Sequence, residues 1–227
     1  VIIPTYNHGE LLNKALRSVL NQSFKNFEVI VIDNFSDDDT QKIVENFGSS
    51  KIVYEKIKNH GVIAKSRNEG IKISRGKWLA FLDSDDIWYE ERLQIVADFL
   101  SENNNYDIIC TDELIVNKIL NKKRIWKYGP FINNFYKHLL QRGNCVSTSA
   151  SIVKKEFLLE QNILFNEKKD FITAEDYDFF MNLAFKKAKF KFLHHILGEH
   201  FFYNKSQSSN YESHKAAIAS VVKHHVF

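Results

Sequence analysis

Residues 78–89 read WLAFLDSDDIWY, and this stretch contains the pattern that decides the fold. Its first five residues are apolar and predict a buried strand, and three carboxylates, Asp83, Asp85 and Asp86, follow at once. Like charges this close repel each other, so the turn is either fully solvated or arranged around a cation. Asp83 and Asp85 are two residues apart, a spacing that in an extended turn can direct two oxygens toward one Mg²⁺ or Mn²⁺ ion.

Strands and helices alternate on both sides of this stretch. Apolar runs predict strands at 1–3, 27–32, 51–57, 77–82 and 106–111, and helical periodicity predicts helices at 10–21, 40–47, 63–74 and 90–100. The alternation predicts an α/β fold with a Rossmann-like, mostly parallel central sheet flanked by helices. Ligands bind beyond the carboxyl ends of such strands, where we expect PTYN, Asp33 and the acidic turn to converge.

The alternation stops after Asp112. Residues 113–174 are expected to be irregular apart from a helix around 134–141, and NKKRIWK at 121–127 is expected to be a solvated loop or a contact with an anionic lipid surface or acceptor. A helix at 174–188, a strand at 190–197 and a helix at 214–226 follow. We expect one domain over 1–227, with a nucleotide-binding half at 1–112 and a half at 113–227 that completes the pocket.

Composition excludes several classes of protein. The chain has 227 residues, 44% of them apolar, and a net charge of +3, which is ordinary for a globular protein and too small for a strong nucleic-acid footprint. No apolar run approaches the roughly 18 residues of a membrane helix. Cys110 and Cys145 offer neither a disulfide framework nor a zinc pattern, so a reducing compartment is expected. Because the sequence starts inside a predicted strand, further residues are expected before Val1.

Five motifs, in this order, resemble the family 2 glycosyltransferases of the GT-A fold. They are VIIPTYN (1–7), EVIVIDNFSDDDT (28–40), GVIAKSRNEGI (61–71), WLAFLDSDDIW (78–88) and AEDYDFF (174–180). The resemblance covers about 1–112 closely and 143–190 more loosely. It implies a nucleotide-sugar donor, usually a UDP-sugar, a divalent Mn²⁺ or Mg²⁺ ion held by the Asp-x-Asp motif, and a glycan or lipid-linked acceptor bound by the half at 113–227.

The resemblance also implies roles for individual residues. Thr5 and Tyr6 are expected to line the uracil pocket, and Asp33 to accept a hydrogen bond from the ring N–H of the base. Asp83 and Asp85 match the metal motif, with Asp85 as the direct metal contact. Asp176 matches the catalytic base, with Glu175 as the second candidate, and Arg67 is expected beside the nucleotide. The expected nucleotide-binding residues are Pro4, Thr5, Tyr6, Asn7, Asp33, Asn34, Arg67, Asp83 and Ser84.

Three stretches depart from the family pattern. The usual DDGS is DNFS, in which Asn34 and Phe35 replace an acid and a glycine, and the usual Ala-Arg-Asn begins with Ser66. Many members carry Tyr-Arg-x-His near the end, where this chain reads FYNKSQSSN at 202–210. We therefore expect the histidines of this region to be structural or surface residues; they are His194, His195 and His200.

The expected reaction is an inverting transfer, because one carboxylate, Asp176, can take the proton of the acceptor hydroxyl and no covalent nucleophile is needed. Alternatively, the acids around Asp176 only favour the positive end of a helix dipole. Two other functions stay open. A sugar nucleotidyltransferase would need a phosphate-binding loop, but PTYNHGE has one glycine and no Lys or Arg. A catalytically inactive nucleotide-binding protein would account for Phe35. The expected location is the cytoplasm, with peripheral contact to the inner face of the membrane as an open alternative.

Overall fold

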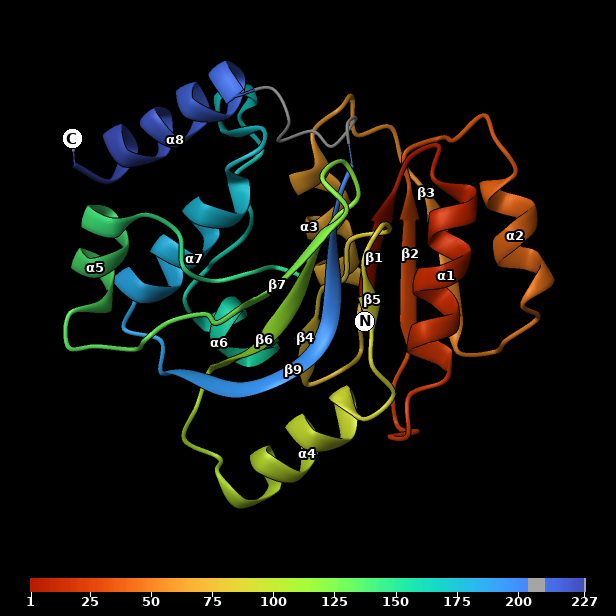
Figure 1. Ribbon diagram of the computed structural model, residues 1–227, viewed down its shortest axis with the longest axis horizontal. Helices are drawn as coiled ribbons and strands as arrows, with labels where there is room; N and C mark the ends of the chain where they lie inside the picture. Colours follow the sequence, from red (N-terminus) through yellow and green to blue (C-terminus); the bar gives the residue numbers. More distant parts are fainter. Residues whose placement is uncertain (204–210, 227) are drawn as a thin grey trace.

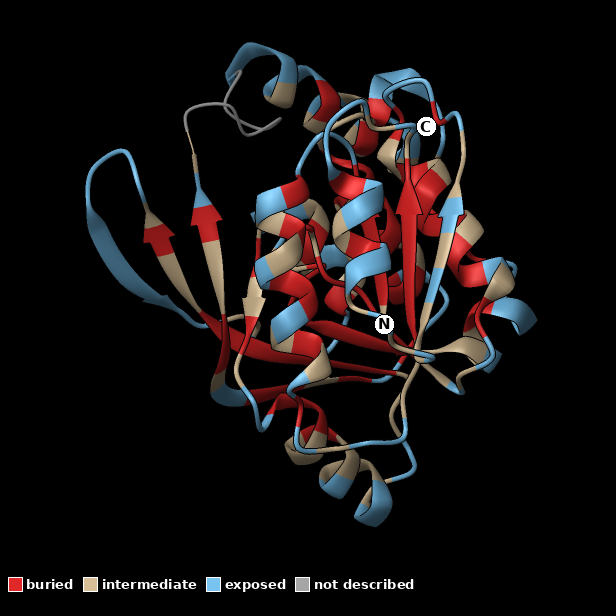
Figure 2. Cartoon of the chain, turned by 90° about the vertical axis from the view of Figure 1, so that its right-hand side faces the viewer, coloured by how far each residue is buried: buried red, intermediate tan, exposed pale blue. Residues whose placement is uncertain are grey.

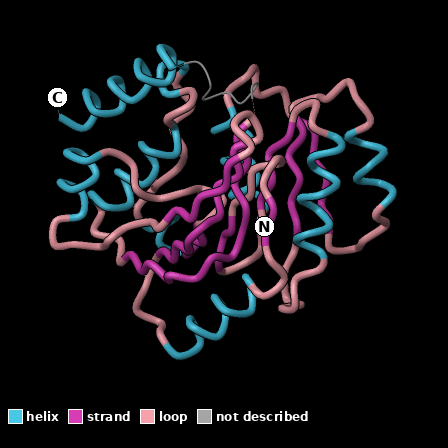
Figure 3. Tube along the Cα trace, viewed as in Figure 1, coloured by secondary structure: helices cyan, strands magenta, loops and turns pink. Residues whose placement is uncertain are grey.

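The computed structural model describes residues 1–203 and 211–226, in which helices surround two sheets (Figures 1 and 3). The N-terminal sheet is parallel, with the strand order β1-β2-β3. Its strands are β1 Ile2–Thr5, β2 Val29–Asp33 and β3 Ile52–Lys56. Every residue of β1 and β2 is buried (Figure 2), as expected for central strands of a sheet that is covered on both faces.

Helices on opposite faces cover this sheet. They are α1 Gly9–Leu20, α2 Thr40–Asn46 and α3 Ile63–Ile73. Successive strand residues point to opposite faces, so Ile3 packs in the core cluster of α1, whereas Ile2 packs in the cluster of α3. Close packing of α3 depends on Gly70, where an added Cβ would lie 2.4 Å from Ile2 Cγ2.

The second sheet is mixed, with the order β4-β8-β6-β9-β5 and with β7 paired to β6. Its strands are β4 Trp78–Ala80, β5 Ile87–Trp88, β6 Ile108–Asn117, β7 Lys122–Trp126, β8 Ser151–Lys154 and β9 Phe190–Phe202. Only β6 and β9 pair in parallel, and the other pairs are antiparallel. The predicted α/β class with a parallel sheet flanked by helices is confirmed, and this second, mixed sheet is an addition to it.

The prediction that residues 113–174 are irregular is wrong. Strand β6 continues to Asn117, and β7, β8 and the short helix α6, Lys155–Glu160, all lie in this region. The predicted solvated loop at 121–127 is mostly strand β7, whose five residues are all exposed. With neither face buried, β7 has no apolar alternation that could reveal it in the sequence.

The remaining helices lie around the second sheet. They are α4 Arg92–Glu102, α5 Phe135–Arg142, the 3₁₀ turn η1 Lys169–Phe171, α7 Glu175–Phe185 and α8 Tyr211–Val226. Each of the two core clusters contains residues from both predicted halves. This shared packing agrees with one domain, and the division into two halves stays a prediction. Residues 204–210, which hold most of FYNKSQSSN, lie outside the described residues. None of the described helices has the length and apolar character needed to cross a membrane.

Candidate active site

The carboxyl ends of three strands meet at one edge, as predicted. Thr5 at the end of β1 is in register with Asp33 at the end of β2. On the other side of β1, Phe81 forms a parallel bridge with Ile2, and the Leu82 amide donates a 3.0 Å hydrogen bond to the Ile2 carbonyl. This bridge joins the two sheets and places the acidic turn beside the loops that follow β1 and β2.

The loops after β1 and β2 hold each other through hydrogen bonds. The Asn7 amide donates to Ser36 Oγ and the Asp37 amide donates to Asn7 Oδ1, both at 2.8 Å. Asn34 donates its amide to the Thr5 carbonyl at 3.0 Å. Asn7 and Phe35 both have a positive φ, of 51° and 53°, the left-handed region in which glycine is favoured. Phe35 therefore occupies a backbone position suited to the glycine that it replaces.

Aromatic and hydroxyl groups stand at the mouth of these loops. The rings of Tyr6 and Phe35 are about half exposed, and the Lys58 ammonium lies 5.4 Å from the centre of the Phe35 ring. The hydroxyl of Thr5 is buried and has no hydrogen-bond partner among the described residues. A nucleotide bound here would find ring surfaces and a free polar atom, so these residues are suited to the binding roles predicted for them.

Asp33 is fully buried and accepts hydrogen bonds from within the chain. Its Oδ1 accepts from the Ser36 amide at 3.0 Å and from Ser36 Oγ at 2.5 Å, and its Oδ2 accepts from the Tyr54 hydroxyl at 2.5 Å. Burial and the charge of Asp33 raise the pKa of Tyr54. Asp33 thus orders the loop after β2, and its contact with a base stays a prediction.

The three carboxylates of the acidic turn have different surroundings, and two of them pair with a basic side chain that relieves their mutual repulsion. Asp86 is buried, and its carboxylate accepts from His200 Nδ1 at 2.9 Å and from the Phe201 amide at 3.1 Å. Burial alone would lower the pKa of His200, but the charge and hydrogen bond of Asp86 outweigh it and raise this pKa to about 10. Asp83 pairs with Arg67 at 2.7 Å.

Asp85 is the uncompensated member of the turn. Among the described residues, none of the ion pairs includes it. Desolvation, followed by the charges of Asp86 and Asp83, raises the pKa of Asp85 to about 7. A cation close to its carboxylate would relieve this repulsion.

A divalent cation fits this pair of carboxylates only with further ligands. No cluster of three or more His, Cys, Asp or Glu side chains suited to a metal ion occurs in the part of the chain that the structure describes. Mg²⁺ typically uses one or two carboxylates together with phosphate oxygens of the substrate. Asp83 and Asp85 fit that mode, in which a nucleotide diphosphate supplies the other oxygens.

Arg67 connects the acidic turn to helix α7. Its guanidinium is buried, and it donates from one nitrogen to Asp83 Oδ1 at 2.7 Å and from another to Glu175 Oε1 at 2.6 Å. The ring of Phe165 lies below it, 5.3 Å from the guanidinium carbon. The structure therefore places Arg67 as a bridge between two predicted site segments, and its contact with the nucleotide stays a prediction.

Asp176 is the second residue of α7 and is partly exposed, whereas Glu175, the first residue, is buried against Arg67. Asp176 Oδ2 accepts a 3.2 Å hydrogen bond from the Asn144 side chain, and Asp176 Oδ1 accepts from the Tyr177 amide at 2.7 Å. Desolvation and the charge of Glu175 raise the pKa of Asp176 to about 7, although the Arg67 charge opposes them. Buried Phe179, Phe180 and Leu183 anchor the helix behind Asp176.

Several neighbours of the site carry no motif in the sequence. His8 Nδ1 lies 3.0 Å from Ser84 Oγ, and burial lowers the pKa of His8. Ser149 accepts the Asp83 amide at its Oγ, 3.1 Å away, and its carbonyl accepts the Trp88 indole N–H at 2.8 Å. Asn144 and Ser149 both lie in the connection between α5 and β8, outside the five motifs, so only the fold identifies them as supports of the site.

Two of the three histidines named from the sequence have structural partners. His200 pairs with Asp86, and His194 Nδ1 lies 3.1 Å from Asp112 Oδ2. His194 and His195 lie where the β6–β9 register shifts between Thr111 and Asp112. His195 is exposed, so all three agree with the expectation of structural or surface positions.

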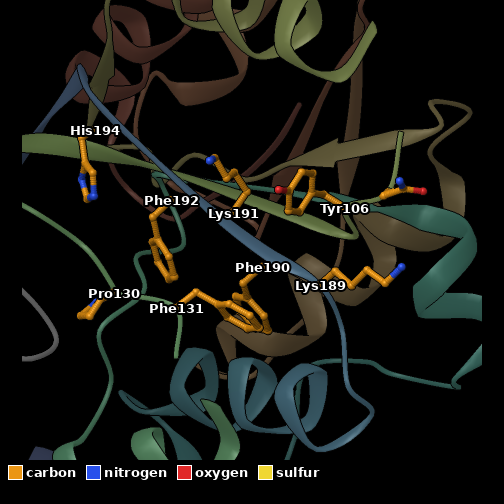
Figure 4. A pocket seen from close by; sticks show the side chains of 9 residues that line it. Tyr106, Pro130, Phe131, Lys189, Phe190, Lys191, Phe192 and His194 are labelled. Carbon is orange, nitrogen blue, oxygen red and sulfur yellow. The ribbon is translucent and has the colours of Figure 1, made fainter. Parts of the chain in front are cut away.

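A cavity of about 530 Å³ lies away from these carboxylates, at the start of β9 (Figure 4). The aromatic rings of Phe131, Phe190 and Phe192 gather on one side of it (Figure 4). Lys191 lies on the same strand as Phe190 and Phe192, and Lys189 comes directly before that strand. None of its lining residues belongs to the predicted nucleotide, metal or catalytic set. The candidate donor site therefore rests on the convergence of strand ends, and this cavity is a separate feature.

Comparison with known proteins agrees with this geometry. Residues 1–159 match the model of glycosyl transferase family 2. The chain is 37% identical over 113 residues to the poly(ribitol-phosphate) beta-N-acetylglucosaminyltransferase TarP of Staphylococcus aureus, an alignment that covers 48% of this chain and 35% of TarP. It is 33% identical over 140 residues to the UDP-Glc:alpha-D-GlcNAc-diphosphoundecaprenol beta-1,3-glucosyltransferase WfgD of Escherichia coli, covering 59% of this chain and 54% of WfgD.

Solved structures show the same fold. S. aureus TarS superimposes with a TM-score of 0.74 at 25% identity, over 90% of this chain and 36% of TarS. TarS 1-349 in complex with UDP-GlcNAc superimposes with a TM-score of 0.73 at 25% identity, over 92% of this chain and 60% of the TarS chain. This chain thus spans about half or less of the curated relatives named above, and it belongs to glycosyl transferase family 2, with the GT-A fold.

Proposed function

We propose that this chain is a nucleotide-sugar glycosyltransferase that moves a sugar from a UDP-sugar to a hydroxyl group of a glycan or lipid-linked acceptor, with inversion at the anomeric carbon. The family match and the TarS complex with UDP-GlcNAc support the donor class. The names of TarP and WfgD, a poly(ribitol-phosphate) and a diphosphoundecaprenol enzyme, support the acceptor class. Within this class, the sugar and the linkage are set by contacts of the bound substrates.

One observation carries the proposal: the partly exposed carboxylate of Asp176 lies at the start of a helix that Arg67 ties to the acidic turn through Glu175 and Asp83. Desolvation and the charge of Glu175 support the proposal, because they raise the pKa of Asp176 to about 7. A general base works best when its pKa is close to the working pH. Asp176 is therefore suited to accept the proton of the acceptor hydroxyl. The acceptor oxygen then bonds to the anomeric carbon while the bond from that carbon to the diphosphate oxygen breaks, and UDP leaves with the electron pair.

The other residues bind and orient the donor in this proposal. Tyr6 and Phe35 offer ring surfaces for the base, and Asp33 orders the loop that carries Phe35 through its hydrogen bonds with Ser36. Asp83 and Asp85 would hold a divalent Mn²⁺ or Mg²⁺ ion. When bound, that ion supplies electrostatic stabilisation of the leaving diphosphate. Arg67 positions Asp83 and α7 relative to each other.

A donor screen combined with one substitution tests the proposal. UDP release is measured with UDP-GlcNAc and UDP-Glc in the presence of candidate acceptors, for the wild type and for Asp176→Asn. Loss of a positioned base lowers the rate by about 10²–10⁴-fold. UDP affinity, measured by calorimetry, should stay unchanged in this variant. Asp170→Asn, an exposed aspartate in η1, is the matched control and should keep the wild-type rate.

The outcomes separate the alternatives. UDP binding without UDP release for any donor and acceptor would favour a catalytically inactive nucleotide-binding protein. Formation of UTP and a sugar 1-phosphate from the UDP-sugar when pyrophosphate is added would favour a nucleotidyltransferase. A near wild-type rate in Asp176→Asn would move the base to another residue, with Glu175 the first to test.

A further inference from the structure

The β6–β7 hairpin, defined here as residues 117–127, forms an outer edge of the second sheet and is exposed along β7 (Figures 1 and 2). It contains five basic residues and no acidic one: Lys118, Lys122, Lys123, Arg124 and Lys127. The rest of the chain holds 26 basic and 28 acidic side chains, a net charge of −2. The positive charge of this protein is therefore concentrated on one protruding hairpin.

Large apolar side chains are exposed on the same hairpin. Ile119, Leu120, Ile125 and Trp126 are between 41% and 63% exposed. Lysines alone would be explained as protection of a sheet edge against pairing with another chain. That explanation does not cover four exposed apolar residues, which would promote association in water. Basic residues combined with Trp, Leu and Ile are instead the composition of segments that lie in the interface of a bilayer.

The backbone arranges these residues for such a contact. Ile119 and Leu120 lie in the turn between the strands, at the tip of the hairpin. On β7, alternate residues share a face, so Lys122, Arg124 and Trp126 lie together, and the Arg124 guanidinium is 4.2 Å from the centre of the Trp126 ring. An apolar tip with cations directly behind it matches the order of acyl chains and phosphate groups in a lipid leaflet.

The hairpin is also connected to the acidic turn. At the turn of the hairpin, the Lys118 amide donates a 3.0 Å hydrogen bond to the Phe202 carbonyl of β9. Two residues earlier on that strand, His200 holds Asp86 of the acidic turn. The tip of the hairpin lies at the same edge of the molecule as the carboxyl ends of β1 and β2 (Figure 1).

From these observations we infer that the β6–β7 hairpin binds the surface of an anionic phospholipid bilayer and turns the donor edge of the protein toward it. The binding partner is a lipid surface because the hairpin combines positive charge with an apolar tip. Anionic lipid headgroups complement the charge, and acyl chains complement the apolar tip. This inference goes beyond the proposed transfer reaction, since membrane binding needs neither donor nor acceptor.

Co-sedimentation of the full chain with vesicles tests it. The protein should bind vesicles rich in phosphatidylglycerol, bind vesicles of phosphatidylcholine alone far more weakly, and be released by high salt. Each basic residue near an anionic surface contributes about five-fold to binding, so Lys122→Ala/Lys123→Ala/Arg124→Ala should weaken it about 100-fold. The matched control, Lys14→Ala/Lys42→Ala/Lys72→Ala, removes the same charge from exposed positions on α1, α2 and α3 and should bind as the wild type.

Contact of β7 with the bilayer is tested separately by fluorescence. Trp126 is exposed, whereas Trp88 is buried and Trp78 partly buried, so vesicle binding should shift the emission of Trp126 to shorter wavelength. Ile119→Ser/Leu120→Ser should reduce this shift while the thermal stability stays at the wild-type value, which shows that the variant is folded. Equal binding to both vesicle types, unchanged binding of the hairpin triple variant, or a concentration-dependent dimer that this variant abolishes would overturn the inference.

Discussion

Replacing Arg67 by methionine removes the bridge between the acidic turn and helix α7. The buried guanidinium donates to Asp83 at 2.7 Å and to Glu175 at 2.6 Å, and methionine keeps the packing against Phe165 but offers no donor. Glu175 is then left as a buried carboxylate without a cationic partner. Its other oxygen, Oε2, already has no hydrogen bond among the described residues. We therefore expect both the stability and the pH dependence of the protein to change.

The size of the effect follows from the burial of each partner. The Glu175 side chain is 8% exposed, so loss of its partner is expected to cost about 3–5 kcal/mol, the range for breaking a buried ion pair. Asp83 is 30% exposed and solvent screens its charge, so its half of the bridge adds little and the lower end of the range applies. For a domain of this size, about 3 kcal/mol corresponds to a fall in Tm of roughly 10 °C.

Thermal and urea unfolding measure this change, and a second substitution identifies its cause. Arg67→Met/Glu175→Gln removes the unpaired charge together with the bridge, so it should recover part of the lost stability. Lys42→Met breaks an exposed ion pair with Asp39 and serves as the control, with little expected change in Tm because solvent screens both charges. Because the Arg67 charge lowers the pKa of Asp176, Arg67→Met should also move the pH profile of transfer to higher pH. A Tm equal to that of the control, or a double variant less stable than Arg67→Met, would refute the reasoning.

Three further predictions follow from the titrating groups. The rate of transfer should rise with pH around 7, because Asp176 has a pKa of about 7 and must lose its proton to act as a base; a flat profile across neutral pH would contradict this role. Asp85→Asn should raise Tm at pH 8 without divalent ions, and abolish any Mn²⁺ dependence of UDP affinity. The pKa of Asp85 is raised to about 7, so its ionised form destabilises the fold as pH rises through that value, and the gain should shrink at pH 5. The Asp86–His200 pair should stabilise the fold fully below about pH 6.5 and lose this effect as pH rises through about 10. The free energies of unfolding of the wild type and His200→Gln, measured with urea, should therefore converge at alkaline pH.

Local patterns in the sequence identify the first half of the molecule. Apolar runs followed by PTYN, Asp33 and the acidic turn predict strands whose carboxyl ends meet, and the structure brings these segments to one edge. Helical periodicity predicts α1 and α3, because an amphipathic helix and a buried strand are each determined by residues close together in the chain. The resemblance of AED at 174–176 to the family motif indicates Asp176 as the candidate base.

Contacts between distant residues were decided by the tertiary structure. The sequence shows three neighbouring acids but not their partners. Asp86 pairs with His200, 114 residues away, and Asp83 pairs with Arg67, which also binds Glu175, 108 residues from that arginine. Asp85 pairs with neither His200 nor Arg67 among the described residues. Strand β7 was missed because all its residues are exposed, and the left-handed φ of Phe35 is imposed by the loop around it. A residue's local pattern reports its own conformation, whereas its charge partner depends on the register of β9 and the packing of α3, which arise only when the whole chain folds.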